Sequence, residues 1–180
     1  IEGFGKLKNG TTVEVTDADG KKSDVTAKNV ILALGARSRE LPNLKQDGEK
    51  VIGYRKAMVL DKQPKKMVVV GSGAIGVEFA YFYNAIGTEV TVVEYMPRIV
   101  PVEDEEVSKA LVRSFKKAGI KIKTDSSVES VDTSGSGCKV TVKTKKGEEV
   151  IECDVVLSAV GIQANLEDCG LEETGVIVDA

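Results

Sequence analysis

The feature that most constrains this chain is a glycine-rich turn between an apolar run and a helix-like pattern. Residues 66–70 read Lys-Met-Val-Val-Val, and the glycines that follow have the spacing Gly-x-Gly-x-x-Gly. A strand, a glycine turn and a helix in this order predict a dinucleotide-binding unit. Gly71 permits the turn, Gly73 lets a pyrophosphate approach the backbone, and Gly76 lets the helix pack against the sheet. We therefore expect the following residues to bind phosphate at the helix start: Gly71, Ser72, Gly73, Ala74, Ile75 and Gly76.

An acidic residue follows at the spacing that such a unit requires. The apolar stretch 89–93 is typical of a second strand, and it ends at Glu94, about 20 residues past the motif. A carboxylate there accepts hydrogen bonds from the adenosine ribose hydroxyls and repels a 2′-phosphate, which favours NAD over NADP. Arg98 would still reach such a phosphate. A β-α-β unit that binds nothing is the alternative interpretation.

Composition and charge exclude several classes of protein. The 180 residues, 42% of them hydrophobic, suffice for one large or two small domains. The formal net charge is −3 and no dense basic run occurs, which argues against a nucleic-acid surface. No apolar run approaches the length that spans a membrane. We therefore expect a soluble cytoplasmic protein, or one of the mitochondrial matrix if the source is eukaryotic.

Residues that commonly carry catalysis and metal binding are scarce. Histidine is absent, which removes the commonest general acid–base residue and metal ligand. Cys138, Cys153 and Cys169 are widely separated and show no Cys-x-x-Cys spacing. This set fits neither a disulfide framework nor a zinc site, so we expect reduced thiols and no metal centre.

Periodicity along the first two thirds of the chain predicts strands and helices in alternation. Residues 6–26 alternate around a turn at Asp19 and Gly20, which predicts antiparallel strands. The apolar run 29–34, ended by Gly35, is typical of a strand buried on both faces. Helices are expected at about residues 55–60, 74–85 and 104–118. The expected core faces of the last two helices are Ile75, Phe79, Phe82 and Ile86, and Val107, Leu111, Phe115 and Ala118.

In the rest of the chain, the pattern changes from alternating strands and helices to strands alone. Residues 120–123 predict a third parallel strand. The alternating segments 127–133, 139–145 and 148–153 are separated by residues 135–137 and by Lys146 and Gly147, and they predict an antiparallel meander. Residues 154–161 predict a second buried strand, ended by Gly161. The fold class is therefore α/β: a Rossmann-like parallel sheet with an antiparallel three-strand meander crossover, and a domain boundary near Gln63.

Together these elements resemble the pyridine nucleotide-disulfide oxidoreductases, and most of all their dihydrolipoamide dehydrogenase branch. The motif at residues 71–78 with Glu94 carries the resemblance, and residues 3–5, 30–42, 86–87, 98–101 and 170–172 support it. In that family, residues 1–63 would be the end of the FAD-binding domain and residues 64–180 most of the NAD-binding domain. The chain begins without methionine, and its last residues have the apolar pattern of an extended segment, so we expect an internal piece of a longer protein.

The resemblance also implies which residues lie near the cofactors. The flavin nucleotide would lie near Gly5, Leu34, Gly35 and Ala36. The residues 71–76, with Glu94, Val128 and Gly161, would hold NAD. Glu78 would orient a flavin-side lysine or the nicotinamide amide; alternatively, it only complements the dipole at the helix start.

The activity implied by the resemblance belongs to the longer protein. Dihydrolipoamide would reduce an enzyme disulfide, electrons would pass to FAD, and a hydride would pass to NAD. This chain contains no redox cysteine pair, no leading FAD motif and no histidine base. We therefore expect no catalytic residue in it and no turnover by it alone. The implied partners are a second subunit in a homodimer and a 2-oxoacid dehydrogenase complex.

Two departures from the family pattern leave alternatives open. Residues 33–35 read Ala-Leu-Gly where the family usually has Ala-Thr-Gly, and residues 161–165 read Gly-Ile-Gln-Ala-Asn where it has Gly-Arg-x-Pro-Asn. A related flavin disulfide reductase, such as a coenzyme A disulfide reductase or mercuric reductase, or an NADH oxidase would share this domain. A free-standing NAD-binding module without redox chemistry is a further alternative.

Overall fold

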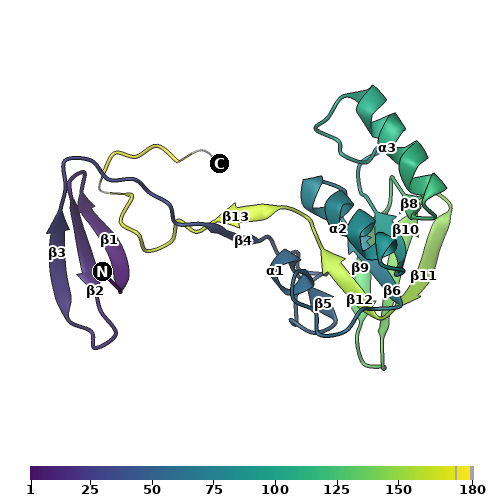
Figure 1. Ribbon diagram of the computed structural model, residues 1–180, viewed down its shortest axis with the longest axis horizontal. Helices are drawn as coiled ribbons and strands as arrows, with labels where there is room; N and C mark the ends of the chain where they lie inside the picture. Colours follow the sequence, from purple (N-terminus) through teal and green to yellow (C-terminus); the bar gives the residue numbers. More distant parts are fainter. Residues whose placement is uncertain (173, 179–180) are drawn as a thin grey trace. The chain divides into compact units, whose positions relative to one another are not determined.

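The computed structural model describes residues 1–172 and 174–178, and its contacts divide the chain into two compact units (Figure 1). One unit comprises residues 38–162; the other comprises residues 1–37 and the segment from Gln163 onward. This division differs from the expected boundary near Gln63. Residues 38–63 belong with the glycine motif because they contribute the strand β5 (Val51–Ile52), which pairs with the parallel sheet, and the short helix α1 (Tyr54–Ala57).

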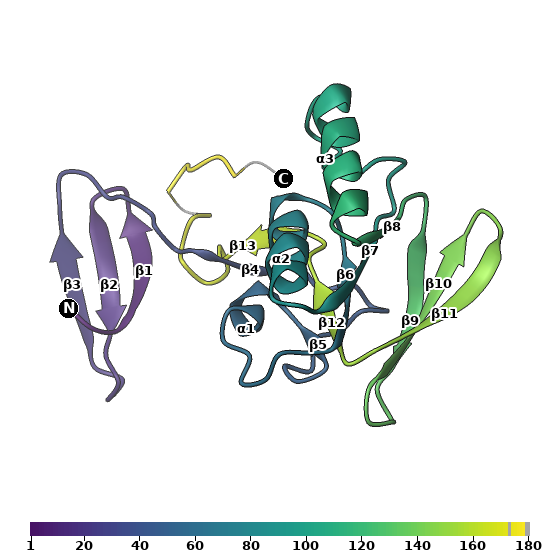
Figure 2. The same cartoon turned by 45° about the vertical axis from the view of Figure 1, so that its right-hand side comes forward.

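A five-stranded parallel sheet organises the larger unit (Figure 2). Its order is β5-β12-β6-β7-β8, with β6 (Lys66–Val70), β7 (Glu89–Val93), β8 (Lys121–Lys123) and β12 (Val155–Ser158). The helix α2 (Ala74–Ala85) connects β6 to β7, and α3 (Glu105–Lys117) connects β7 to β8, which confirms the predicted order of elements. Among the described residues, no helix combines the length and the apolar character needed to cross a membrane.

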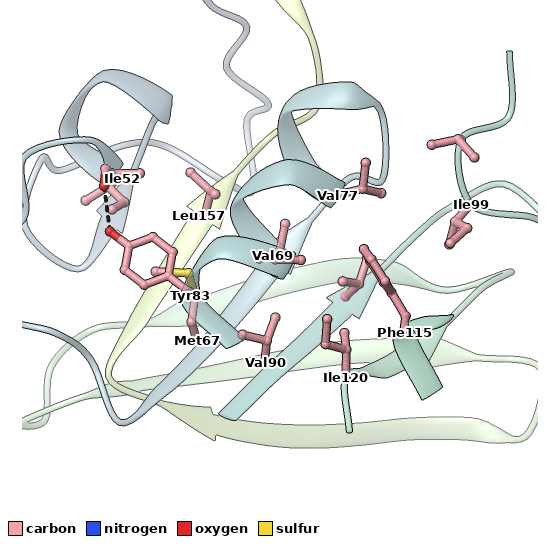
Figure 3. Packing of buried hydrophobic residues seen from close by; sticks show 14 residues of the cluster. Ile52, Met67, Val69, Val77, Tyr83, Val90, Ile99, Phe115, Ile120 and Leu157 are labelled. Atoms are coloured by element: carbon pink, nitrogen blue, oxygen red, sulfur yellow. Dashed lines mark hydrogen bonds between the residues drawn. The ribbon is translucent and has the colours of Figure 1, made fainter. Parts of the chain in front are cut away.

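Alternating side chains build a core on each face of this sheet. In β6, Met67 and Val69 pack on the helix side of the sheet, whereas Val68 and Val70 pack on the other side. The sides alternate because successive strand residues point to opposite faces. Figure 3 shows the helix-side cluster, which Val77 and Tyr83 of α2 and Phe115 of α3 complete. The strands therefore have continuous apolar sequences because both faces of the sheet are covered.

An antiparallel meander covers the other face. It consists of β9 (Ser127–Asp132), β10 (Cys138–Thr144) and β11 (Gly147–Cys153), which confirms the expected three strands in place of a crossover helix. Val140 and Val142 of the meander belong to one buried cluster with Val68 and Val156 of the sheet.

The register of the last hairpin differs from the expectation. Thr144 pairs with Gly147, so Lys145 and Lys146 form the turn, whereas the sequence pattern places the turn at Lys146 and Gly147. A shift of one residue in a turn changes every cross-strand partner in the hairpin.

The smaller unit contains a three-stranded antiparallel sheet. Its strands β1 (Phe4–Asn9), β2 (Thr12–Thr16) and β3 (Lys22–Thr26) confirm the antiparallel pattern expected for residues 6–26. Leu7 packs with Cys169 and Leu171, and its N–H donates a hydrogen bond to the backbone oxygen of Cys169 at 2.8 Å. Where the chain passes between the units, β4 (Ala36–Ser38) pairs with β13 (Ile162–Ala164).

The prediction of a buried strand at residues 29–34 is wrong. This segment has no regular structure, and Ile31 is 91% exposed. A parallel strand needs neighbouring strands to satisfy its backbone groups and covered faces to bury its side chains. None of the described strands pairs with this segment. Apolar composition is therefore not sufficient to form a strand here.

The core faces of both long helices also differ in part from the expectation. Phe82 of α2 and Ile86, which follows the last residue of α2, are exposed. The buried residues of that helix are Gly76, Val77, Ala80 and Tyr83. In α3, Phe115 is buried as expected, but Val107 is exposed. Because α2 is apolar around most of its circumference, periodicity alone does not select a face; the small residues Gly76 and Ala80 face the sheet and permit close packing.

Tyr83 provides a test of the helix-side packing. It is 3% exposed, and its hydroxyl donates a hydrogen bond to the backbone oxygen of Ala57 at the end of α1 (Figure 3). Because Tyr83→Phe leaves this buried oxygen without its donor, we expect the free energy of unfolding to fall by about 1–2 kcal/mol. Tyr81→Phe is the matched control on the exposed side of α2, with an expected change below about 0.5 kcal/mol. Equal losses for the two variants in urea unfolding would contradict this role.

Candidate functional site

Three segments selected from the sequence meet at the carboxyl edge of the parallel sheet. Gly71 follows the end of β6, Glu94 follows the end of β7, and β12 leads toward Gly161. The N–H of Gly71 donates to Val93 O at 2.9 Å, so the ends of β6 and β7 are directly joined. The chain leaves β6 toward β7 on one side and returns as β12 on the other, so the strand order reverses beside β6. Open α/β sheets bind ligands outside the carboxyl ends of their strands at such a point.

Two of the three motif glycines are required by the packing of the protein itself. A Cβ atom on Gly76 would overlap the backbone oxygen of Gly71, and one on Gly71 would overlap the backbone oxygen of Ala159. Gly71 also has a φ of +95°, in the left-handed region that favours glycine. These contacts let the end of β6, the first turn of α2 and the segment after β12 approach one another at backbone distance.

The remaining motif glycine, Gly73, faces free space at the start of α2. Among the described residues, no side chain caps the helix at Gly73, and no atom beyond Gly73 and its two chain neighbours lies within 4 Å of the position that a Cβ would take there. The first N–H groups of a helix lack acceptors within the helix and carry the positive end of its dipole. Backbone donors, positive potential and free space therefore coincide, and this combination fits the pyrophosphate of a dinucleotide.

Glu94 points back toward the glycine turn and is 7% exposed. Its Oε2 accepts hydrogen bonds from Ser72 N at 2.8 Å and from Ser72 Oγ at 2.5 Å. Its Oε1 accepts a hydrogen bond from Met96 N at 2.8 Å. Each carboxylate oxygen can accept about two hydrogen bonds, so Oε2 is fully used by Ser72 and Oε1 retains capacity for one ribose hydroxyl. Sequence reasoning missed the second role of this residue, which is to tie β7 to the turn after β6.

The other residues expected to bind NAD lie in different environments. Gly161 has a φ of +113° and faces free space, and its oxygen accepts a hydrogen bond from Arg39 N at 3.0 Å. Glu78 is exposed on α2. Val128 is buried in the cluster on the meander side, and its backbone oxygen accepts a hydrogen bond from the Asn43 side chain. The side chain of Val128 is thus committed to the core, and its contact with NAD stays a prediction.

The residues expected near the flavin all belong to the smaller unit. Gly5 lies within β1 and pairs with Val15 of β2. Leu34 and Gly35 form an irregular segment, and Ala36 begins β4. Gly35 has a φ of +71°, so a left-handed turn ends the apolar run before β4.

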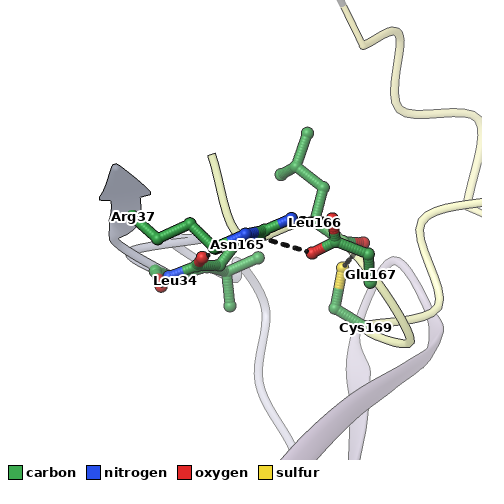
Figure 4. A network of polar contacts seen from close by, with 6 residues as sticks. All are labelled: Leu34, Arg37, Asn165, Leu166, Glu167 and Cys169. Carbon is green, nitrogen blue, oxygen red and sulfur yellow. Dashed lines mark hydrogen bonds and ion pairs between the residues drawn. The ribbon is translucent and has the colours of Figure 1, made fainter. Parts of the chain in front are cut away.

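Asn165 holds this segment through three hydrogen bonds, and Figure 4 draws two of the partner residues, Leu34 and Arg37. Its Nδ2 donates to Leu34 O at 3.1 Å, its backbone N–H donates to Gly35 O at 3.0 Å, and its Oδ1 accepts from Arg37 at 2.9 Å. Sequence reasoning missed Asn165 as a site residue. A signal was present in the sequence, because Asn165 retains the asparagine of the family pattern Gly-Arg-x-Pro-Asn.

Arg37 also forms a bidentate pair with Glu167 (Figure 4). The two guanidinium contacts measure 2.6 and 3.0 Å. The hydrogen bond from Arg37 lowers the pKa of Glu167 to about 2. Both side chains are solvent-exposed, so the pair orders the segment locally and contributes little to global stability.

The fold is that of an α/β protein of the Rossmann type, with a candidate ligand site at the switch point of its sheet. The family model described as "Pyridine nucleotide-disulphide oxidoreductase" matches residues 2–180. The chain therefore belongs to the pyridine nucleotide-disulphide oxidoreductase family, as the sequence resemblance predicted.

Individual relatives cover the whole chain but extend well beyond it. The dihydrolipoyl dehydrogenase of Chlorobaculum tepidum is 41% identical over 98% of this chain, which spans 38% of that protein. The mitochondrial dihydrolipoyl dehydrogenase of Pisum sativum is 38% identical over 99% of this chain, which spans 36% of it. Among solved structures, LpdA of Mycobacterium tuberculosis has a TM-score of 0.87 at 33% identity, with 100% of this chain and 40% of LpdA covered. The flavoprotein disulfide reductase RclA of Escherichia coli, at 22% identity and a TM-score of 0.83, shares the fold; it is matched over 99% of this chain and 40% of its own.

The different environments of two motif glycines lead to a prediction about stability. Gly76→Ala places a Cβ against a backbone oxygen, so we expect a loss of about 1–3 kcal/mol in the free energy of unfolding. Gly73→Ser is the matched variant, because serine is a favoured N-cap and the space there is free. We expect Gly73→Ser to retain wild-type stability. Denaturant unfolding of both variants measures the difference, and a stable Gly76→Ala would contradict the close packing.

The pair between Arg37 and Glu167 predicts a pH dependence. The pKa of Glu167 is lower in the folded chain than its ordinary value of 4.5. Its stabilising contribution is therefore complete above about pH 4.5 and is lost as the pH falls toward 2. In Arg37→Gln we expect the Glu167 pKa to return toward its ordinary value. NMR titration of the Glu167 side chain tests this, and an unchanged midpoint would exclude Arg37 as the cause.

Proposed function

We propose that this chain is the NAD-binding portion of an FAD-dependent dihydrolipoyl dehydrogenase, which positions the nicotinamide for hydride transfer from reduced flavin. The observation that carries the proposal is the arrangement at the carboxyl edge of the sheet. There the uncapped start of α2 at Gly73 lies beside a carboxylate, Glu94, that is fixed by Ser72. The names of the relatives support the particular enzyme.

The residues of this chain would bind and orient NAD without taking part in a chemical step. The N–H groups after Gly73 would hold the pyrophosphate, and Oε1 of Glu94 would accept a hydrogen bond from the adenosine ribose. When bound, the flavin supplies the hydride and NAD accepts it. Fixed binding of the dinucleotide favours that transfer because it removes the entropy cost of orienting the nicotinamide. Glu78, exposed on α2, would orient the nicotinamide amide or a flavin-side lysine.

The segment from Leu34 to Ala36, with Gly5, would contribute to the FAD site of the longer protein. The hydrogen bonds of Asn165 support this role, because they hold the backbone of Leu34 and Gly35 in one conformation. We further propose that the longer protein is a homodimer, works with a 2-oxoacid dehydrogenase complex and resides in the cytoplasm, or in the mitochondrial matrix of a eukaryote.

A related flavin disulfide reductase is the second candidate. The departures at residues 33–35 and 161–165 favour it, since they alter loops expected near the flavin and the dinucleotide. The activity of the full-length protein distinguishes the two. A dihydrolipoyl dehydrogenase reduces NAD with dihydrolipoamide, whereas residues 1–180, tested alone, should give no turnover.

The NAD site is tested by titrating NADH and NADPH into the full-length protein. Glu94→Gln removes the charge while keeping the shape of the side chain, so we expect NADH to bind about tenfold more weakly, a change of about 1.4 kcal/mol. The preference for NADH over NADPH should also fall. Gly73→Ser should weaken binding of both dinucleotides, because its side chain occupies the space left for phosphate.

Glu89→Gln is the matched control for Glu94→Gln. Glu89 lies at the opposite end of β7, where it pairs with Lys121 on the surface. We expect NADH to bind to this variant as tightly as to the wild type. Equal affinity of wild type and Glu94→Gln for NADH would contradict the proposed ribose contact.

A further inference from the structure

Two of the three cysteines face each other across the last hairpin of the meander. Cys138 begins β10 and Cys153 ends β11, and the register pairs them directly. Opposed residues of an antiparallel pair have Cα atoms about 4.5–5.5 Å apart. A disulfide forms without backbone movement at roughly 4.4–6.8 Å. The hairpin therefore presents a dithiol that is already arranged for bridging.

This dithiol is buried but reachable. Cys138 is 2% and Cys153 is 6% exposed, and both line a surface cavity of about 380 Å³. The turn at residues 135–137, together with Lys66 and Asp154, lines the same cavity. Its volume lies within the range of small-molecule sites. A small reagent can therefore enter the space beside the two cysteines in the folded protein.

Neighbouring contacts hold the sulfur atoms in place. The Sγ of Cys138 lies 3.8 Å from the backbone oxygens of Lys50 and Asp154. The Nζ of Lys50 donates hydrogen bonds to the backbone oxygens of Thr133 and Gly135, which fixes the turn beside the cavity. Both cysteines also belong to the buried cluster on the meander side of the sheet. Most of the conformational entropy that bridging would cost is therefore already lost on folding.

We propose that Cys138 and Cys153 form a thiol–disulfide site that exchanges with low-molecular-weight disulfides. The Cys138 thiolate attacks one sulfur of the small disulfide, whose S–S bond breaks and releases one small thiolate. The Cys153 thiolate then attacks the Cys138 sulfur and displaces the second small thiolate. The two protons lost by the cysteines protonate the two released thiolates. The cysteine pair is thus oxidised by two electrons, and the small disulfide is reduced to two thiols.

The surroundings determine the rate of this exchange. Burial raises the pKa of the Cys138 thiol and raises the pKa of Cys153 to about 12. The ammonium group of Lys50 partly offsets the effect of burial at Cys138, so we assign the first attack to that residue. Because the thiolate is the attacking species, the rate should rise by about tenfold per pH unit below the pKa.

The test uses the folded full-length protein and oxidised glutathione. After incubation at pH 7 and pH 8, free thiols are alkylated, the protein is digested without reduction, and the peptides are mapped by mass spectrometry. We expect a peptide pair linked through Cys138 and Cys153, formed about tenfold faster at pH 8 than at pH 7. This result does not depend on the proposed dinucleotide site.

Two variants separate the steps. Cys153→Ala should stop at a glutathione mixed disulfide on Cys138, and Cys169→Ala should form the bridge like the wild type. If a variant does not fold, the peptide map of the wild-type protein still tests whether Cys138 and Cys153 become linked. The proposal is overturned if wild-type Cys138 and Cys153 both remain alkylatable, or if their linked peptide appears only in denaturant.

Discussion

The candidate site depends on the close approach of three backbone segments, which only glycine permits. The end of β6, the first turn of α2 and the segment after β12 meet where Gly71 and Gly76 lack side chains. The buried carboxylate of Glu94 then binds Ser72 through its N–H and its hydroxyl, so β7 is joined to the same turn. A charged group at 7% exposure is tolerated because its oxygens are hydrogen-bonded. The start of α2 is therefore held rigidly, with its N–H groups left for a ligand.

The valine-rich strands explain how this edge is supported. Because β6 and β7 are covered by helices on one face and by the meander on the other, the sheet is buried on both sides. The meander takes the place of a crossover helix between β8 and β12, and it still brings β12 back into register beside β6. The same hairpin that covers the sheet also opposes Cys138 and Cys153. One element thus supports the glycine turn and forms the dithiol.

The smaller unit shows how strongly strand formation depends on neighbours. Residues 29–34 are as apolar as the buried strands of the parallel sheet, yet they are irregular and largely exposed. Where strand pairing is absent, polar contacts between side chains and backbone order this part of the chain. The side chain of Asn165 reaches Leu34 and Arg37, and Glu167 completes the network. These residues lie more than a hundred positions apart, so their association is a property of the fold.

The sequence by itself determined the elements whose signals are local. The dinucleotide turn was predicted from the spacing of Gly71, Gly73 and Gly76 and from the acid at Glu94, because such a turn depends on φ and on the donors at a helix end. The strands and helices were predicted from hydrophobic periodicity, including the period of two in the meander, because periodicity is a property of a few neighbouring residues. Tertiary structure determined which face of α2 is buried and left residues 29–34 without strand partners. It also brought Asn165 to the segment before β4 and placed Cys138 opposite Cys153. These outcomes depend on packing partners and strand register, and the energy of a long-range contact is not encoded in the residues around either end.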